Sequence, residues 1–501
     1  MSLATRLPCD EAAIQSGVHD AALSPCGPWV LAAAILGSSL AFIDGTVVSV
    51  ALPAMARELH ASLVDMQWVV EAYTLFLSAL LLVGGSLGDR AGRKRVFAIG
   101  VAIFASASLA CALAPTLSLL LAARAAQGVG GALLVPGSLA LISASFDREH
   151  RGQAIGTWSG FSGITTALGP LLGGWLVSHS WRWAFFLNLP LAAVVLLLLI
   201  KVPESRNPHA RSLDLPGAAL ATVGLGGCVL GLVESSRRGW DHPLVLGGLA
   251  IGAASLAAFL LIESRSAAPM LPLALFRSRA FAGANLVTLF LYGALATVFF
   301  FLPLDLIEVQ GYTPLGAGAA ILPLIVIMFA LSRWAGGLVA RHGARLPLLV
   351  GPTLAGAGFF ALSLPSVGGA YAVTFLPGMI ILGLGMSLSV APLTTTVMNA
   401  VPEDNAGVAS GVNNAVSRAA GLVSIALLGI LMAAENRSAL AHSHVAGLAF
   451  ATGFRAVARA SAALALLGAL CAWIWIPVAR PRPDGDAGRV LRASSRQRGI
   501  T

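Results

Sequence analysis

Apolar stretches of about twenty residues or more recur along almost the whole chain, each long enough to cross roughly 30 Å of hydrocarbon as a helix. Short segments with charged residues, proline or glycine separate them, and we count about fourteen between residues 29 and 478. A membrane-spanning β-strand would be about ten residues long with alternating polarity, which segments such as 191–200 and 286–304 lack. The sequence therefore predicts an all-α integral membrane protein of about fourteen transmembrane helices.

The composition argues against a water-soluble protein. Only 11% of the 501 residues are charged and 57% are hydrophobic, whereas soluble domains carry about 25% charged residues. A chain of this length cannot bury so much apolar surface in one core, so the bilayer must act as its solvent. The five cysteines show neither metal-ligand spacing nor a pairing pattern, and we expect no metal site.

Basic residues lie mainly in alternate loops. If the N-terminus is cytoplasmic, the inner loops include the cluster from Arg90 to Arg95 and the tail after residue 478 is rich in arginine. The outer loops hold fewer basic residues: Arg57, Arg182, Arg237, Arg238, Arg437 and, next to the last span, Arg455 and Arg459. Cytoplasmic loops retain Lys and Arg during insertion, so the bias predicts an inner-membrane protein with both termini in the cytoplasm. It also explains the net charge of +9 without a nucleic-acid partner.

A repeat divides the chain into two halves. Segment 85–94 returns as 336–345, and a weaker echo relates 152–156 to 407–411 at nearly the same offset. Parallel repeats of this kind are a recurring architecture of transporters. We predict an organisation in five parts: a cytoplasmic tail at 1–28, a six-helix bundle at 29–200, a two-helix insert with linkers at 201–280, a second six-helix bundle at 281–478 and a basic cytoplasmic tail at 479–501.

Five motifs follow one another in the first half: IDGTVVSVALP (43–53), GSLGDRAGRKR (85–95), LAARAAQGVGG (121–131), GITTALGPLLGG (163–174) and WRWAFFLNLP (181–190). In this order they resemble the major facilitator superfamily, specifically its fourteen-span drug:proton antiporter family of multidrug efflux proteins. The resemblance implies two six-helix bundles plus a two-helix insert. It also implies drug export and antibiotic resistance, driven by the proton gradient without a cofactor.

Three charged residues inside predicted spans are candidates for proton coupling. Asp44 lies about halfway along the first span, where a carboxylate costs about 2.5–3.5 kcal/mol unless it faces a cavity or a partner. Arg124 is the only charge inside span four, and Asp44 is its natural partner; the resemblance implies that this arginine takes part in proton transfer. Glu71, near the outer end of span two, is expected to line an outward vestibule. The alternative for Asp44 and Arg124 is a static buried ion pair that fixes packing.

The turn between spans two and three is a candidate gate, and its expected residues are Gly85, Asp89, Arg90, Gly92, Arg93 and Lys94. We expect its charges to latch the two halves together on the cytoplasmic side, the alternative being simple positive-inside anchoring. The second-half loop has Ala340 where the first has Asp89, so an ion pair requiring that acid exists on one side only.

Glycines in span five permit close helix packing, and a proline there permits a kink; these residues are Gly163, Gly169, Pro170, Gly173 and Gly174. The resemblance assigns this run to antiporters. Polar contacts in a substrate cavity are expected from Gln127, Asn413, Asn414 and Arg418.

No Walker loop, zinc spacing or nucleophile elbow occurs in the sequence, so we do not expect an enzyme. The leading hypothesis is a proton-coupled antiporter that exports small lipophilic compounds, cationic ones among them, across the lipid bilayer. A symporter or facilitator for a small polar metabolite, and a receptor or scaffold without transport, are the alternatives. The sequence does not indicate an oligomeric state, and a monomer is the working expectation.

Overall fold

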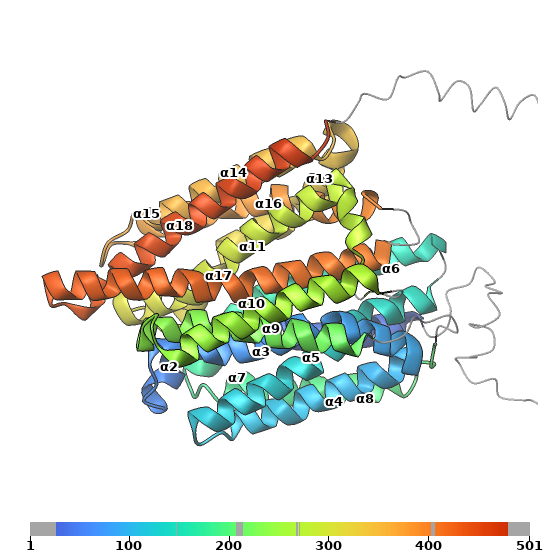
Figure 1. Cartoon of the computed structure of the whole chain (residues 1–501), viewed down its shortest axis with the longest axis horizontal. Helices are drawn as coiled ribbons and strands as arrows, with labels where there is room; N and C mark the ends of the chain where they lie inside the picture. The colour runs from blue at the N-terminus through green and yellow to red at the C-terminus, as the bar shows by residue number, and fades with distance from the viewer. Residues whose placement is uncertain are drawn as a thin grey trace, which may run out of the picture.

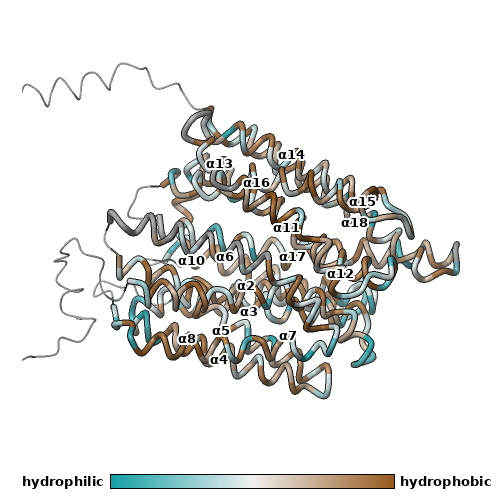
Figure 2. Tube along the Cα trace, turned by 180° about the vertical axis from the view of Figure 1, so that it is seen from behind, coloured by the Kyte–Doolittle hydropathy of each residue, from teal (hydrophilic) through white to brown (hydrophobic). Residues whose placement is uncertain are grey.

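The computed structural model describes residues 27–146, 148–206, 214–266, 269, 271–401 and 406–478, and within them the chain is helical without strands (Figure 1). The long helices lie side by side along one direction. Hydrophobic residues dominate the middle of the helices, and hydrophilic ones gather at their ends (Figure 2). This confirms the predicted all-α membrane protein. The predicted tails 1–28 and 479–501 lie almost entirely outside the described residues.

The first half contains α2 (Gly27–Glu58), α3 (Leu63–Ala91), α4 (Arg93–Ala112), α5 (Leu117–Ser145), α6 (Arg148–Val177), α7 (Trp183–Phe186) and α8 (Asn188–Leu199). Local sequence fixes where these helices begin. Ser62 and Asp65 form a capping box at α3, in which the Ser62 backbone N–H donates to Asp65 Oδ2 at 2.8 Å. Thr116 caps α5 through the backbone N–H of Leu119.

The second half contains α11 (Arg279–Leu304), the π-helix η2 (Asp305–Val309), α12 (Pro314–Ala319), α13 (Leu322–His342), α14 (Arg345–Leu362), α15 (Tyr371–Thr374), α16 (Leu376–Asn399), α17 (Ala406–Ser443) and α18 (Ala446–Trp475), after a short 3-10 helix η1 (Leu273–Arg277). The halves meet where α2 contacts α11, α3 contacts α17, and α6 contacts α12 and α13. We call the end that carries the α3–α4 turn the basic end, and the end where α2 finishes at Glu58 the opposite end.

The insert, α9 (Leu215–Arg238) and α10 (Pro243–Arg265), packs through α9 on both α3 and α17. One apolar cluster joins all three helices, with Leu75 of α3, Val229 and Val233 of α9, and Leu422 and Ala426 of α17. On the α3 side polar contacts are added: Trp68 Nε1 donates to Glu234 Oε1 at 3.2 Å, and Arg237 lies 3.5 Å from Asp65. The insert therefore lies across the seam between the halves.

Two helices run further than the sequence predicts. The sequence between the last two apolar stretches predicts a loop from Glu435 to Arg455, but α17 continues to Ser443 and α18 begins at Ala446. No glycine or proline interrupts residues 435–443, and the chain reverses at His444, whose φ is +55°. The apolar run 281–304 predicts a ninth span that ends at Leu304, yet η2 continues the helix to Val309.

Among the described residues, 12 helices are long and apolar enough to cross a bilayer. Two shorter apolar segments, Leu168–Val177 and Trp183–Leu199, fall at the predicted fifth and sixth spans. The architecture of many apolar helices is confirmed, and the number fourteen stays a prediction. The predicted domain limits also stay predictions.

Candidate functional site

Asp44 and Arg124 form a buried ion pair at the centre of the first half. Arg124 Nη1 lies 2.6 Å from Asp44 Oδ2, and the two side chains are 1% and 0% exposed. The pair joins α2 to α5, which bring the two residues together from 80 positions apart. Low exposure strengthens the attraction between the charges but also makes either charge costly without the other.

Three polar side chains surround the carboxylate. Gln127, one turn after Arg124 on α5, donates to Asp44 Oδ1 at 2.7 Å and accepts from Arg124 Nη1 at 2.7 Å. Asn188 of α8 donates to the same Asp44 oxygen at 3.3 Å, and Ser108 of α4 accepts from both Gln127 and Asn188 at 2.9 and 3.2 Å. Side chains of α5 and α8 therefore bind the acid of α2 directly, and Ser108 of α4 supports two of them.

The remaining side of Arg124 is enclosed by α3 and α7. Its Nε donates to the backbone carbonyl of Val69 at 3.0 Å. Its guanidinium carbon lies 4.4 Å from the centre of the Tyr73 ring and 5.8 Å from that of Phe185. Cation–π contacts of this kind stabilise a desolvated guanidinium. Arg124 is thus held between Asp44 on α2 and the surface formed by α3 and α7.

Glu71 lies at the seam between the halves. It is 0% exposed, and neither carboxylate oxygen has a hydrogen-bond partner among the described residues. One turn before it, Gln67 Nε2 donates to the carbonyl of Ile425 on α17 at 3.3 Å, and one turn after it Leu75 packs with Leu422. The expectation that Glu71 lines an open vestibule therefore does not hold in this conformation, because α17 covers this face of α3.

Helix α17 carries three of the polar residues expected in the substrate cavity: Asn413, Asn414 and Arg418. Asn413 donates to Thr288 Oγ1 at 2.6 Å and to Asn285 Oδ1 at 3.2 Å, so its amide joins α17 to α11. In the described part of the chain, neither the buried Nε of Arg418 nor the hydroxyl of Tyr73 has a hydrogen-bond partner. Asn414 is partly exposed. Of the residues expected in the cavity, Gln127 belongs to the Asp44 network and Asn413 holds two helices together.

Within the part of the chain that the structure describes, the contacts of the turn at the basic end do not reach the second half. Arg93 Nε donates to Asp89 Oδ1 at 2.8 Å, an i,i+4 pair across the turn at Gly92. The carboxylate of Glu204, after α8, accepts from the backbone N–H groups of Lys94 and Arg95 at 3.0 and 3.1 Å, where it caps α4. Arg90 is exposed, and Gly85 lies over Pro136 of the same half. All these contacts stay in or beside the first half, because a neighbouring charge and a helix end satisfy the turn locally.

The glycine run of α6 packs the first half on itself and on the second. A Cβ on Gly169 would lie 1.9 Å from Thr46 Oγ1, and one on Gly173 would lie 3.0 Å from Val47, both on α2. A Cβ on Gly174 would lie 2.5 Å from the carbonyl oxygen of Pro314 of α12. Gly163 belongs to α6, but its surroundings lie outside the described residues. Pro170 lies inside the continuous helix.

Helix α12 meets α6 with a glycine of its own, Gly318, whose added Cβ would lie 2.0 Å from the carbonyl oxygen of Pro170. We expect Gly318→Ala to lower the stability of the packed state by about 1–3 kcal/mol, because the obstacle is backbone that cannot rotate away. Thermal unfolding of the purified protein measures the effect. Gly247→Ala, at a position with open space, is the matched control and should change little. Equal stabilities of the two variants would contradict this contact.

Sequence reasoning missed three polar residues. Asn188 stands in the WRWAFFLNLP motif without a role having been assigned to it, and Ser108 is a small polar residue of a kind common in apolar helices. Asp305 is 1% exposed in η2, with Oδ1 unpartnered and Oδ2 accepting from Gln310 at 3.3 Å. The sequence signal for Asp305 was an acid directly after the long apolar run 281–304. Because the predicted span ends at Leu304, this acid falls outside it.

Comparison with known proteins agrees with this architecture. A family model described as Major Facilitator Superfamily matches residues 34–425. The fold is similar to that of an auto-inhibited POT family peptide transporter, with a TM-score of 0.65, 17% identity, and 91% of this chain and 98% of that chain covered. It is also similar to that of a D-xylose–proton symporter, with a TM-score of 0.61, 16% identity, and 90% and 98% covered.

Several proteins known from their sequences share a higher identity with this chain than these two solved structures do. The chain is 38% identical over 406 residues to multidrug resistance protein Stp of Mycobacterium tuberculosis, covering 80% of this chain and 74% of that protein. It is 34% identical over 412 residues to the tetracenomycin C resistance and export protein of Streptomyces glaucescens, covering 81% and 76%. It is 35% identical over 469 residues to a puromycin resistance protein of Streptomyces alboniger, covering 89% and 91%. The chain therefore belongs to the Major Facilitator Superfamily, in its multidrug efflux family, and is a membrane transporter rather than an enzyme.

Proposed function

We propose that this protein is a proton-coupled antiporter that exports small lipophilic compounds, cationic ones among them, across the inner membrane by alternating access. Both termini are cytoplasmic in this proposal, so the basic end faces the cytoplasm. The relatives named as resistance and export proteins support the direction of transport. The observation that carries the coupling is the Asp44–Arg124 pair, fully enclosed among polar side chains at mid-helix.

A proton and a substrate can both act on such a pair. Protonation of Asp44 removes its charge, so the attraction to Arg124 is lost and its guanidinium is freed to favour its neutral partners, Gln127 and the Val69 carbonyl. Because those partners lie on α5 and α3, the change alters how α2 is held against them. Two packings of the helices would then differ in proton affinity, which is the condition for coupling.

The proposed preference of the transporter for cationic compounds rests on Glu71. A carboxylate without a hydrogen-bond partner is costly at a buried seam, and a proton or a bound cation would relieve that cost. It lies between α3 and α17, which belong to different halves. When the halves separate at this seam, Glu71 becomes accessible. Competition between a cationic compound and a proton at this acid would contribute to exchange.

Transport in inverted membrane vesicles tests the proposal. We expect the uptake of a lipophilic cationic dye to rise when the vesicle interior is made acidic and to stop when an ionophore collapses the pH gradient. Export driven by proton exchange requires both results. Vesicles without the protein are the control. Dye movement that is indifferent to the imposed gradient would contradict proton coupling, while leaving the family membership untouched.

A further inference from the structure

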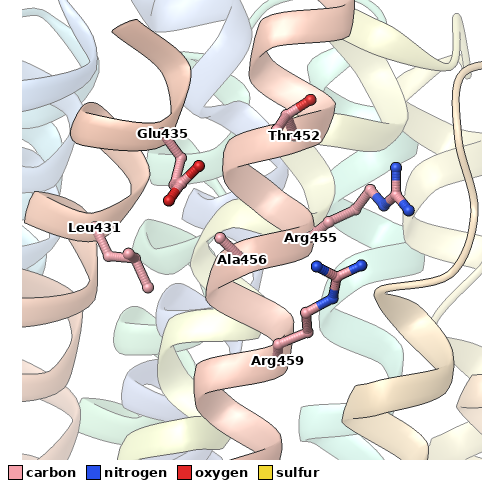
Figure 3. Close-up of a pocket in the computed structure, with 6 residues that line it drawn as sticks. All are labelled: Leu431, Glu435, Thr452, Arg455, Ala456 and Arg459. Carbon is pink, nitrogen blue, oxygen red and sulfur yellow. The ribbon is translucent and has the colours of Figure 1, made fainter. Parts of the chain in front are cut away.

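A pocket of about 370 Å³ lies between α17 and α18 near the opposite end of the bundle (Figure 3). It is lined by Leu431, Glu435, Thr452, Arg455, Ala456 and Arg459. Arg455 Nε donates to the carbonyl of Ser363, the residue that ends α14, at 2.9 Å. Arg455 is therefore level with that end of α14. Arg459, four residues further along α18, lies about 6 Å closer to the middle of the bundle.

One residue that lines the pocket, Arg459, is on an exposed face of α18. This face continues toward the basic end with Leu466, Leu470 and Ile474, which are 49%, 45% and 58% exposed. In a membrane transporter an apolar exposed helix face of this kind contacts lipid chains. Arg459 therefore lies close to the boundary between hydrocarbon and headgroups.

The charges that line the pocket are not paired with one another. Within the part of the chain that the structure describes, Arg459 makes no hydrogen bond or ion pair, and Glu435 is not within ion-pair distance of either arginine. Arg455 uses only Nε for Ser363, so its two terminal nitrogens remain able to donate. A guanidinium at the edge of the hydrocarbon needs an anion or water.

A phospholipid phosphate satisfies this need, because guanidinium groups bind phosphate oxygens with two parallel hydrogen bonds. Glu435, the third charged residue of the pocket, limits which phospholipid headgroups fit. Glu435 projects from α17 on the other side of the pocket from Arg455 and Arg459 (Figure 3). A carboxylate there complements a positively charged amine that lies a short distance from the phosphate. A primary ammonium can donate hydrogen bonds to it, whereas a trimethylammonium cannot.

We propose that this pocket binds the headgroup of an aminophospholipid, with the phosphate on Arg459 and Arg455 and the ammonium on Glu435. The acyl chains follow the exposed face of α18 past Leu466 and Leu470. In the proposed orientation the lipid belongs to the outer leaflet. The binding itself depends neither on that orientation nor on proton coupling.

Native mass spectrometry of the purified full chain, titrated with phosphatidylethanolamine, tests the proposal. We expect Arg459→Gln to weaken binding of this lipid about tenfold, the typical effect of losing a charge-assisted hydrogen bond. Arg459→Lys should weaken it less, since the charge remains. Arg437→Gln is the matched control, because Arg437 is an exposed arginine at the same end of α17 but outside the pocket. Glu435→Gln should reduce the preference for phosphatidylethanolamine over phosphatidylcholine.

Size-exclusion profiles confirm that each variant is folded before its binding is compared. Equal lipid retention by Arg459→Gln and the unmodified protein would overturn the proposal, and so would an equal loss in Arg437→Gln, which would indicate general charge attraction. Phosphoethanolamine without acyl chains separates the two sources of the phosphate. Displacement of the lipid by this soluble compound at comparable concentration would identify a free phosphate ester as the ligand and would also overturn the lipid assignment.

Discussion

Asp44→Asn is expected to reduce proton-driven efflux to the level of vesicles that lack the protein. Asparagine has nearly the same shape as aspartate, and its carbonyl oxygen can still accept a hydrogen bond from Arg124 or Gln127. It cannot bind and release a proton in the physiological range, so the exchange has no titrating group. Dye uptake by inverted vesicles with an imposed pH gradient measures the loss. Substrate binding without a gradient should persist.

Two further variants make that result specific. Asp44→Glu retains a carboxyl group and should keep part of the proton-driven uptake. Asp241→Asn removes an exposed carboxylate between α9 and α10 and should leave uptake unchanged. If Asp44→Asn transports in response to the gradient as the unmodified protein does, Asp44 is not the coupling site and the pair serves packing alone.

Arg124→Ala is expected to destabilise the protein by about 3–5 kcal/mol, the usual cost of leaving one member of a buried ion pair alone. The substitution removes the contact at 2.6 Å to Asp44 and the hydrogen bond to Val69, and it also empties space beside Tyr73. Thermal unfolding in detergent, followed by loss of the monodisperse peak, measures the change. The melting temperature should fall by several degrees or more, in proportion to this cost.

The double variant Asp44→Asn with Arg124→Gln controls for that result. Replacing both charges removes the unpaired charge, so a large part of the lost stability should return. Arg437→Ala, at an exposed arginine, should have little effect. A double variant as unstable as Arg124→Ala would mean that lost packing, rather than an uncompensated charge, explains the effect.

The central pair was predictable from sequence because a charge in an apolar helix has few options. An unpaired charge inside a membrane span costs free energy, and this cost predicts that Asp44 and Arg124 pair with each other. Ser108 and Asn188 carry no such penalty. A neutral polar residue can satisfy itself within its own helix, as Ser108 partly does through the carbonyl of Phe104. Which helices face Asp44 depends on packing that no local pattern states.

The latch between the halves stays a prediction, and the contacts of its turn were hard to predict for a related reason. Motif residues Asp89 and Arg93 indicated a charged turn, but not its partner. In the structure the i,i+4 pair and the cap by Glu204 satisfy the turn within one half. No sequence pattern indicates Glu204 as a partner of this turn, because it lies 110 residues from Lys94 and outside every predicted span. Local pairing competes with long-range pairing, and sequence alone does not show which prevails.

Apolar contacts join α9 to both α3 and α17, and within the described part of the chain the contact with α3 also carries polar pairs, which has a consequence for motion. Hydrogen bonds and ion pairs depend on direction and distance, so the contacts of Trp68 and Asp65 with Glu234 and Arg237 resist displacement. Apolar contacts are not directional, and the surface shared with α17 can shift with little loss. When the two halves move relative to each other during the proposed alternating access, the insert should therefore move with the N-terminal half. Helix α17 should then slide along α9.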